Sequence, residues 1–302
     1  MNKKIVVIGS CNIDMVVKTD RLPMPGETVL GGSFMMNPGG KGANQAVAVA
    51  RLGGNATFIT KIGNDLFGKQ SIEMFNKENI NIDNILSDPH QPSGVALIMV
   101  DVNGENCIVV ASGANANLNV YDIEKTRNVI ERADILLMQL EIPMSTVEYA
   151  AKIAFDKGIK VILNPAPATS LSNELIKCLY AIVPNKTEAE MLSGIKVDDW
   201  KSARQAADII SDKGVDIVVI TLGSRGALIK KRDSYVEVPV EKIKAIDTTA
   251  AGDTFCGAFC VGLSEGLSVE DAVRMANQAA GITVTREGAQ AAIPYRKEIK
   301  LL

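Results

Sequence analysis

Short apolar β runs alternate with helical patterns along most of this chain, and this alternation restricts its fold more than any other feature. Predicted strands lie at residues 3–9, 56–62, 135–139, 160–163, 181–183 and 217–221. Predicted helices lie at residues 43–52, 66–77, 122–132, 145–157, 171–178, 186–192, 201–213, 255–263 and 269–283. Such spacing is typical of a parallel sheet covered by helices on both faces. We therefore predict an α/β fold in which most strands of the central sheet are parallel.

Two further β runs interrupt this rhythm. Residues 94–101 and 106–111 are joined by Val102-Asn103-Gly104-Glu105, in which Asn-Gly strongly favours a hairpin turn. We place this hairpin outside the main sheet, and residues 27–36 alternate loosely enough to contribute strands as well. The length of 302 residues suits one large α/β domain or two small ones, and no interdomain linker or internal repeat divides it.

Composition excludes several kinds of partner. Lys and Arg total 32 against 35 for Asp and Glu, which gives no reason to expect nucleic acid or an anionic membrane. Aromatic residues make up 4%, too few to stack on single-stranded nucleic acid. No apolar run has membrane-spanning length, and residues 5–8 are too short for a signal peptide. Five cysteines without a C-x-x-C pair favour reduced thiols in a cytoplasmic protein. Cys256 and Cys260, at i and i+4 of a helix, are interpreted as packing residues.

A glycine-rich stretch, Asn37-Pro38-Gly39-Gly40-Lys41-Gly42-Ala43-Asn44-Gln45-Ala46, runs into the first predicted helix. It lacks the spacing of a Walker A loop, and no G-x-G-x-x-G follows the first strand, which argues against a dinucleotide-binding dehydrogenase. Glycines allow backbone amides to approach a ligand closely. Lys41 and Asn44 can reach the same ligand from the first helical turn. The alternative is a plain turn before a helix.

A second stretch of small residues, Asp247-Thr248-Thr249-Ala250-Ala251-Gly252-Asp253-Thr254, leads into the helix predicted near Phe255. Free N–H groups and the positive dipole end at a helix start bind anions, phosphate above all. A carboxylate beside an anion is repelled by it, unless the carboxylate accepts a proton from the group that attacks the anion. Asp253 is therefore either a general base or a helix cap or first-turn acid, a common use of Asp. This stretch by itself favours neither interpretation.

Polar residues follow several predicted strands, at the edge where open α/β sheets bind ligands. They are Asn12, Asp14, Glu141, Asn164, Asn185, Thr221 and Gly223. Asn12 and Asp14 face one side of an extended chain and suit adjacent sugar hydroxyls, although an Asx turn is at least as common there. Asn185 and Glu188, one helical turn apart, could hold hydrated Mg²⁺, or Glu188 could balance the helix dipole.

The stretches at residues 37–46 and 247–255 together resemble the two signature motifs of the ribokinase-like (PfkB) family of sugar kinases, and the likeness extends from Val6 to about Pro294. The resemblance implies a three-layer α/β sandwich in one domain, residues 1–302, with a small β-sheet lid at about residues 13–36 and 94–111. It also implies a homodimer formed through the lid. The implied reaction is ATP-dependent phosphorylation of D-ribose at its 5-hydroxyl, which gives D-ribose 5-phosphate and ADP.

The same resemblance assigns roles by position. The implied sugar ligands are Asn12, Asp14, Gly40, Lys41, Asn44, Glu141 and Asp253. The implied contacts of ATP and its Mg²⁺ are Asn185, Glu188, Thr221, Gly223, Gly252 and Asn277. The implied anion hole is Ala250, Ala251 and Gly252, with Asp253 as general base. The implied neighbours of a monovalent cation, K⁺, are Asp247, Thr249, Thr283, Arg286 and Gly288.

Two residues depart from the family pattern. Ala292 stands where a serine often lies near the cation, and Cys256 stands where asparagine is common. The alternative functions are a related kinase for another small sugar, a deoxysugar or a nucleoside, and a catalytically silent sugar or nucleotide sensor. The low aromatic content argues against a nucleoside, and the presence of Asp253 argues against a silent sensor.

Overall fold

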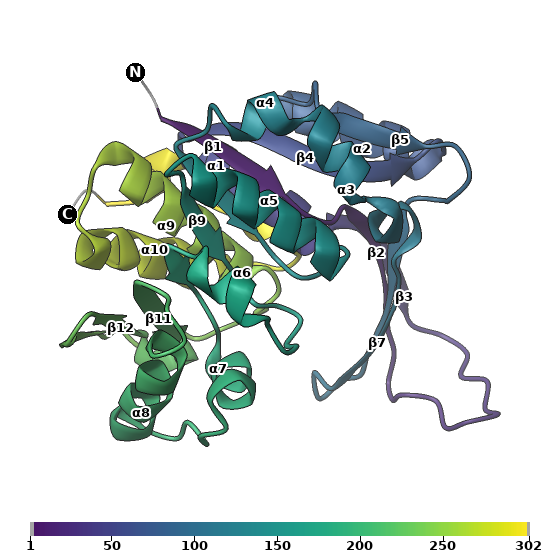
Figure 1. Ribbon diagram of the computed structural model, residues 1–302. Coiled ribbons are helices and arrows are strands. Elements are labelled where there is room, and N and C mark those ends of the chain that lie inside the picture. Colours follow the sequence, from purple (N-terminus) through teal and green to yellow (C-terminus); the bar gives the residue numbers. More distant parts are fainter. Residues whose placement is uncertain (1–2, 301–302) are drawn as a thin grey trace.

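A large central sheet and a small projecting sheet organise the computed structural model, which describes residues 3–300 (Figure 1). The nine-stranded sheet contains β1 (Lys4–Ile8), β4 (Asn55–Gly63), β5 (Ile85–Asp88), β8 (Ile135–Met138), β9 (Lys160–Leu163), β10 (Ala181–Ile182), β11 (Ile217–Thr221), β12 (Ala227–Lys231) and β13 (Ser234–Val238). The four-stranded sheet contains β2 (Asn12–Lys18), β3 (Ser33–Gly39), β6 (Gly94–Val100) and β7 (Asn106–Ala111).

Helices cover both faces of the large sheet. They are α1 (Lys41–Arg51), α2 (Leu66–Lys77), α3 (Val120–Lys125), α4 (Arg127–Ile130), α5 (Met144–Asp156), α6 (Asn173–Lys177), α7 (Lys186–Ser193), α8 (Trp200–Ser211), α9 (Ala251–Glu265) and α10 (Val269–Thr283). Short 3-10 turns lie at Gly113–Asn117, Gly223–Arg225, Gln290–Ala292 and Arg296–Glu298. In the described part of the chain, no helix combines the length and the apolar character that crossing a membrane requires.

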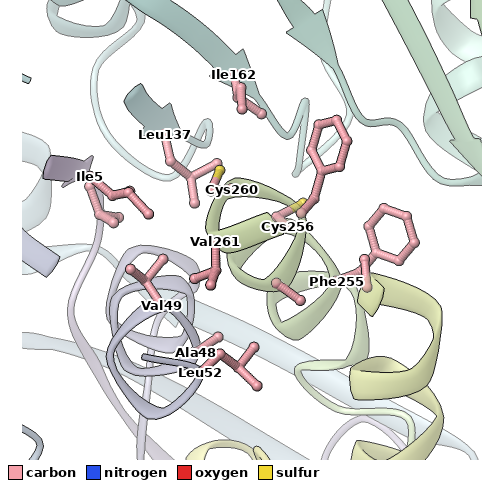
Figure 2. Packing of buried hydrophobic residues seen from close by; sticks show 14 of the residues in the cluster. Ile5, Ala48, Val49, Leu52, Leu137, Ile162, Phe255, Cys256, Cys260 and Val261 are labelled. Atoms are coloured by element: carbon pink, nitrogen blue, oxygen red, sulfur yellow. The ribbon is translucent and has the colours of Figure 1, made fainter. Parts of the chain in front are cut away.

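The alternation of side chains along β1 shows how the sheet separates two hydrophobic cores. Ile5 and Val7 point to the face covered by α1, α2, α9 and α10, whereas Val6 and Ile8 point to the face covered by α3 to α8. The predicted three-layer α/β fold is therefore confirmed. In Figure 2, Cys256 and Cys260 of α9 lie among the apolar side chains of this first core. Both are buried free thiols, which confirms that they are packing residues.

Strand order is β13-β12-β11-β10-β9-β8-β1-β4-β5. Neighbours from β11 to β5 are parallel, and β12 and β13 add an antiparallel edge. The predicted mostly parallel sheet is confirmed. The predicted hairpin is confirmed as β6 and β7, which pair antiparallel outside the main sheet.

Several details differ from the prediction. Strands β5, β12 and β13 were not predicted, and residues 27–32 form no strand. The helix predicted at residues 122–132 divides into α3 and α4 at Thr126, whose hydroxyl donates to the carbonyl of Ile123 at 3.0 Å. Such a bond offers the backbone an alternative to continuing the helix. The helix predicted near Phe255 begins earlier, at Ala251, because Ala250 takes the left-handed conformation just before it.

Candidate active site

The candidate site lies where the strand order reverses. From β1 the chain crosses the small sheet to β4 on one side, whereas β8 pairs with β1 on the other side. Such a reversal opens a crevice at the carboxyl ends of the strands. Ser10 follows β1, Glu141 follows β8 and Asn164 follows β9. Polar side chains therefore gather at the edge where the sequence predicted ligand binding.

Glycines bring the start of α1 against the end of β1. Gly40 has φ +87°, and a Cβ there would lie 2.7 Å from the backbone nitrogen of Asn12. A Cβ at Gly42 would lie 2.5 Å from the carbonyl carbon of Gly9. This close approach lets the backbone N–H of Lys41 donate to Oε2 of Glu141 at 3.0 Å. The glycine-rich stretch is therefore more than a plain turn, because it couples α1 to the strand ends.

Asp253 lies in the first turn of α9 and points to α1. Its Oδ2 accepts from Nδ2 of Asn44, and its Oδ1 accepts from Nε2 of Gln45, both at 3.0 Å. The N-cap residue of α9 is Ala250, and no side chain caps the helix there. Asp253 is therefore not the cap of α9, but it is an acidic residue in the first turn of that helix, which was the other form of this interpretation. Burial raises the pKa of its carboxyl, although Lys41 and the two amides act in the opposite direction.

Lys41 is the cation at the centre of a group of carboxylates. Burial by itself lowers the pKa of its ammonium, but Asp253, Glu141 and Glu188 outweigh burial and raise that pKa. Lys41 therefore stays protonated at neutral pH. Because it interacts with Glu188 as well as with Asp253, it connects the predicted sugar ligands with the predicted nucleotide ligands.

Asn12 and Asp14 lie on β2, not in the loop turn that was the alternative. Asn12 is buried, and its Oδ1 accepts from Nδ2 of Asn115 at 2.8 Å. Burial raises the pKa of Asp14 to about 6, with smaller contributions from the charges of Glu141 and Asp253. The positive charge of Lys41 acts in the opposite direction. In the described part of the chain no hydrogen bond holds the Asp14 carboxylate, so both of its oxygens are available to a ligand.

The start of α9 offers free backbone donors. Ala250 has φ +59°, a conformation that costs a non-glycine residue free energy and is concentrated at functional sites. Among residues 3–300, no carbonyl accepts the N–H groups of Gly252 and Asp253. A Cβ at Gly252 would meet no atom within 4 Å, so the space beside it is open. These features suit an anion at the helix start.

Four of the predicted nucleotide ligands lie at or just after the ends of β10 and β11, and the charge of one of them, Glu188, interacts with that of Asp253. Asn185 and Glu188 form a reciprocal cap of α7: Oδ1 of Asn185 accepts from the N–H of Glu188 at 2.9 Å, and Oε2 of Glu188 accepts from the N–H of Asn185 at 2.8 Å. Asn185 also pairs with Thr221 in a parallel bridge. Gly223 has φ +58° and open space beside it. Nδ2 of Asn277 donates to the carbonyl of Val238 at 3.2 Å. That carbonyl lies beside the turn that begins at Gly223, because a Cβ at Gly226 would lie 2.1 Å from its oxygen.

Three of the five predicted cation neighbours are joined directly by hydrogen bonds, and the N–H of Asp247 also donates to the carbonyl of Val284, which lies next to Thr283. Asp247 accepts from the N–H of Thr249 at 2.9 Å and from the N–H of Gly288 at 3.0 Å. Burial by itself raises the pKa of Asp247, but these hydrogen bonds outweigh burial and lower it. The hydroxyl of Thr283 faces Thr254 in the core, and the guanidinium of Arg286 pairs with Glu298.

Comparison with known proteins decides the family. Residues 2–296 match the model of the pfkB family carbohydrate kinases. The chain belongs to this family. It is 45% identical over 298 residues to the ribokinase of Haemophilus influenzae, covering 99% of this chain and 97% of that protein. It is 38% identical over 291 residues to the deoxyribokinase of Salmonella typhi, covering 96% and 95%. The solved structure of Arabidopsis thaliana ribokinase complexed with ribose and ATP matches it with a TM-score of 0.93 and 33% identity, covering 99% and 97%.

Polar residues without a predicted role also lie at the site of this pfkB-family chain. The hydroxyl of Ser10 donates to Oε2 of Glu141 at 2.6 Å. Asn115 joins Asn12 to the backbone of Cys11. Gln139 donates to Oε1 of Gln45 at 2.6 Å. Gln45 lies within the glycine-rich stretch, and Ser10 belongs to the polar cluster after the first predicted strand, but no sequence signal placed Asn115 and Gln139 beside the site.

Asp14→Asn should raise the free energy of unfolding at pH 7.5 by about 1–3 kcal/mol. The folded pKa of Asp14, about 6, lies above its ordinary value of 3.8, so the ionised carboxylate destabilises the fold. That cost is absent below the ordinary value and is complete above the folded one. Urea unfolding at pH 4, 6 and 7.5 measures the gain, with the exposed Asp212→Asn as control. A gain that is equal at all three pH values would contradict the assignment.

Proposed function

We propose that this pfkB-family protein transfers the terminal phosphoryl group of ATP to the 5-hydroxyl of D-ribose, giving D-ribose 5-phosphate and ADP. The observation that carries the proposal is the buried Asp253 carboxylate, held by two amides at a helix start whose N–H groups are free. The likeness to the Arabidopsis enzyme in complex with ribose and ATP supports the choice of substrates.

The sugar is held by donors and acceptors of complementary kinds. Asn12, Asp14, Gly40, Lys41, Asn44 and Glu141 are the proposed ligands. The Asp14 carboxylate accepts from sugar hydroxyls, because the surrounding chain leaves its oxygens free. The Lys41 ammonium donates to the sugar oxygens. Glu141 is positioned by two donors, the hydroxyl of Ser10 and the N–H of Lys41, and keeps its other oxygen for the sugar.

Asp253 accepts the proton of the attacking hydroxyl, and the helix start of α9 stabilises the phosphoryl group. Phosphoryl transfer depends on alignment and charge stabilisation more than on covalent chemistry. The proposed anion hole is Ala250, Ala251 and Gly252. The proposed contacts of ATP are Asn185, Glu188, Thr221, Gly223, Gly252 and Asn277. Asn277 would act on ATP in one of two ways. Its side chain would position the carbonyl of Val238, or it would leave that carbonyl and contact ATP directly.

Mg²⁺ and K⁺ belong to this proposal. Mg²⁺ would neutralise phosphate charge, and Asn185 and Glu188 would hold it through water. Both Glu188 oxygens already accept N–H groups of Asn185, which suits water-mediated contact better than direct ligation. In residues 3–300, no three His, Cys, Asp or Glu side chains converge as a metal site. K⁺ would lie in the loop that Asp247, Thr249 and Gly288 shape, with Thr283 and Arg286 contributing backbone oxygens. Ala292 supplies no hydroxyl there.

The test is an ADP-release assay over D-ribose, 2-deoxy-D-ribose, fructose, adenosine and no sugar, each with K⁺ or Na⁺. We expect turnover that is selective for D-ribose and greater with K⁺. The 2-deoxyribose arm matters because a deoxyribokinase is 38% identical to this chain. Selectivity for 2-deoxyribose would show that 2-deoxyribose, not D-ribose, is the substrate. Sugar binding without turnover would contradict the proposal that the protein is a kinase.

We propose that the small sheet is a lid over the sugar and joins two copies of the chain in the cytoplasm. Residues paired across strands share a face, and the row Met36, Met15, Leu97 and Val109 lies opposite the face that carries Asp14. Leu97 and Val109 are 52% and 60% exposed. Five free cysteines agree with a reducing compartment.

Leu97→Glu should convert the protein from dimer to monomer, because a charge in an apolar interface stays unpaired. Light scattering after size-exclusion chromatography measures the mass. Val102→Glu is the matched control, since Val102 is exposed in the hairpin turn. A monomeric wild type, or a Leu97→Glu protein that stays dimeric, would show that this face is not the interface.

A further inference from the structure

Gln45 joins Asp253 to the central sheet. Its side chain is fully buried, with 0% exposure. Its Nε2 donates to Oδ1 of Asp253 at 3.0 Å and to Oδ1 of Asn164 at 3.2 Å. Its Oε1 accepts from Nε2 of Gln139 at 2.6 Å. Asn164 is itself fixed, because its Nδ2 donates to the carbonyl of Val183 at 3.1 Å.

This network fixes which end of the Gln45 amide meets the carboxylate. Because Gln139 donates to Oε1, the Nε2 end must face Asp253. Gln139 has room only because residue 9 is glycine, where a Cβ would lie 1.9 Å from Oε1 of Gln139. Gln139 and Asn164 follow β8 and β9. The Asp253 carboxylate is therefore held against two strand ends of the sheet.

The two carboxylate oxygens have different partners. Oδ1 accepts from Gln45, which has no proposed contact with substrate, whereas Oδ2 accepts from Asn44, a proposed sugar ligand. We propose that Gln45 is a positioning residue for phosphoryl transfer, which holds Oδ1 of Asp253 and turns Oδ2 towards the attacking hydroxyl. This inference rests on the proposed function. It makes Oδ2 the oxygen that accepts the proton of the attacking hydroxyl.

Replacing Gln45 removes a donor from a buried carboxylate. Gln45→Met should lower kcat roughly 10- to 100-fold, because small misplacement of a reacting group costs that much, and leave the KM for the sugar nearly unchanged. The loss of a hydrogen bond to the charged form raises the pKa of Asp253, so the acidic limb of the kcat profile should move to higher pH. The charged or titratable groups around Asp253 are Asp14, Lys41, Glu141, Glu188 and Cys256.

The decisive experiment compares Gln45→Met in the wild type and in Asp253→Asn. A residue that acts through Asp253 lowers kcat in the first background and causes no further loss in the second. Gln139→Met should give a smaller loss in the same direction, and it replaces Gln45→Met if that variant does not fold. Thr60→Val removes another buried polar group of the described chain and serves as control. Equal losses in both backgrounds, or an unchanged pH profile, would overturn the inference.

A second readout needs no turnover and separates this inference from the proposed function. The ionised Asp253 costs more folding free energy when Gln45 is absent, and that cost grows as pH rises through the folded pKa. The difference in Tm between wild type and Gln45→Met should therefore widen from pH 5 to pH 8. In the Asp253→Asn background, the difference should be independent of pH. If the wild type phosphorylates no sugar but these shifts appear, the proposed function fails and the positioning of Asp253 stands.

Discussion

Asp253→Asn should lower kcat by about 10²- to 10⁴-fold, the usual contribution of a general base. The KM for D-ribose should change little, because asparagine has nearly the same shape and can still meet the amide of Asn44. The ADP-release assay with saturating ATP gives both constants. Asp212→Asn, an exposed change of the same kind, is the control. A kcat within a few-fold of the wild type would remove Asp253 as the base.

The same variant should be more stable than the wild type at neutral pH. Burial raises the folded pKa of Asp253, so its ionised form destabilises the fold. This cost appears as pH rises through the folded pKa, and asparagine avoids it. We therefore expect a higher Tm for Asp253→Asn at pH 8 and a smaller difference at pH 4. A lower Tm at pH 8 would show that the contacts of the carboxylate outweigh its burial. Gain of stability with loss of activity is the trade expected of an active-site group.

Arg51→Met should lower the free energy of unfolding by about 3–5 kcal/mol, since it leaves a buried carboxylate without its partner. Arg51 and Glu78 form a bidentate pair with distances of 2.9 and 2.6 Å, and their side chains are 11% and 13% exposed. Nη1 of Arg51 also donates to the carbonyls of Gln290 and Ile293. Arg51 therefore ties α1 and α2 to the C-terminal loop. Chemical unfolding measures the loss.

Two variants test the cause of that loss. The double variant Arg51→Met/Glu78→Met should be less destabilised than Arg51→Met, because no unpaired charge remains in it. Arg274→Met breaks an exposed i, i+4 pair with Glu270 and should cost about 0–1 kcal/mol. If the double variant were less stable than Arg51→Met, the loss would come from the contacts of Arg51 with the carbonyls of Gln290 and Ile293 and not from an unpaired charge.

Local pattern was enough for most of the secondary structure. The predicted boundaries of α2, β7, β9, β11 and α10 match the structure residue for residue. These segments have clear periodicity or β-branched runs between turn residues. The elements that were not predicted, or were predicted with a wrong boundary, lack such signals. β5 has only two apolar residues between polar neighbours, and the start of α9 depends on the left-handed conformation of Ala250, which alanine rarely adopts.

For the site, the sequence supplied the residues and the tertiary structure supplied their partners. The glycine-rich stretch indicated close approach to a ligand and the stretch before α9 indicated an anion site, whereas the assignment of the first stretch to a sugar followed from the family resemblance. The partners of the Asp253 carboxylate are Asn44 and Gln45, which lie 209 and 208 positions away in the chain. No local pattern encodes such a distance, because contacts of this kind form only when the sheet brings its strand ends together.

The sequence by itself therefore determined the α/β class, the parallel sheet and most of the residues at its carboxyl edge, because hydrophobic periodicity and glycine are local properties. Only the tertiary structure decided what holds those residues. Gln45, Gln139 and Ser10 are ordinary polar residues until burial removes water from them. A buried polar group must find its partner within the fold, and that requirement depends on the packing of α1 and α9 against the sheet.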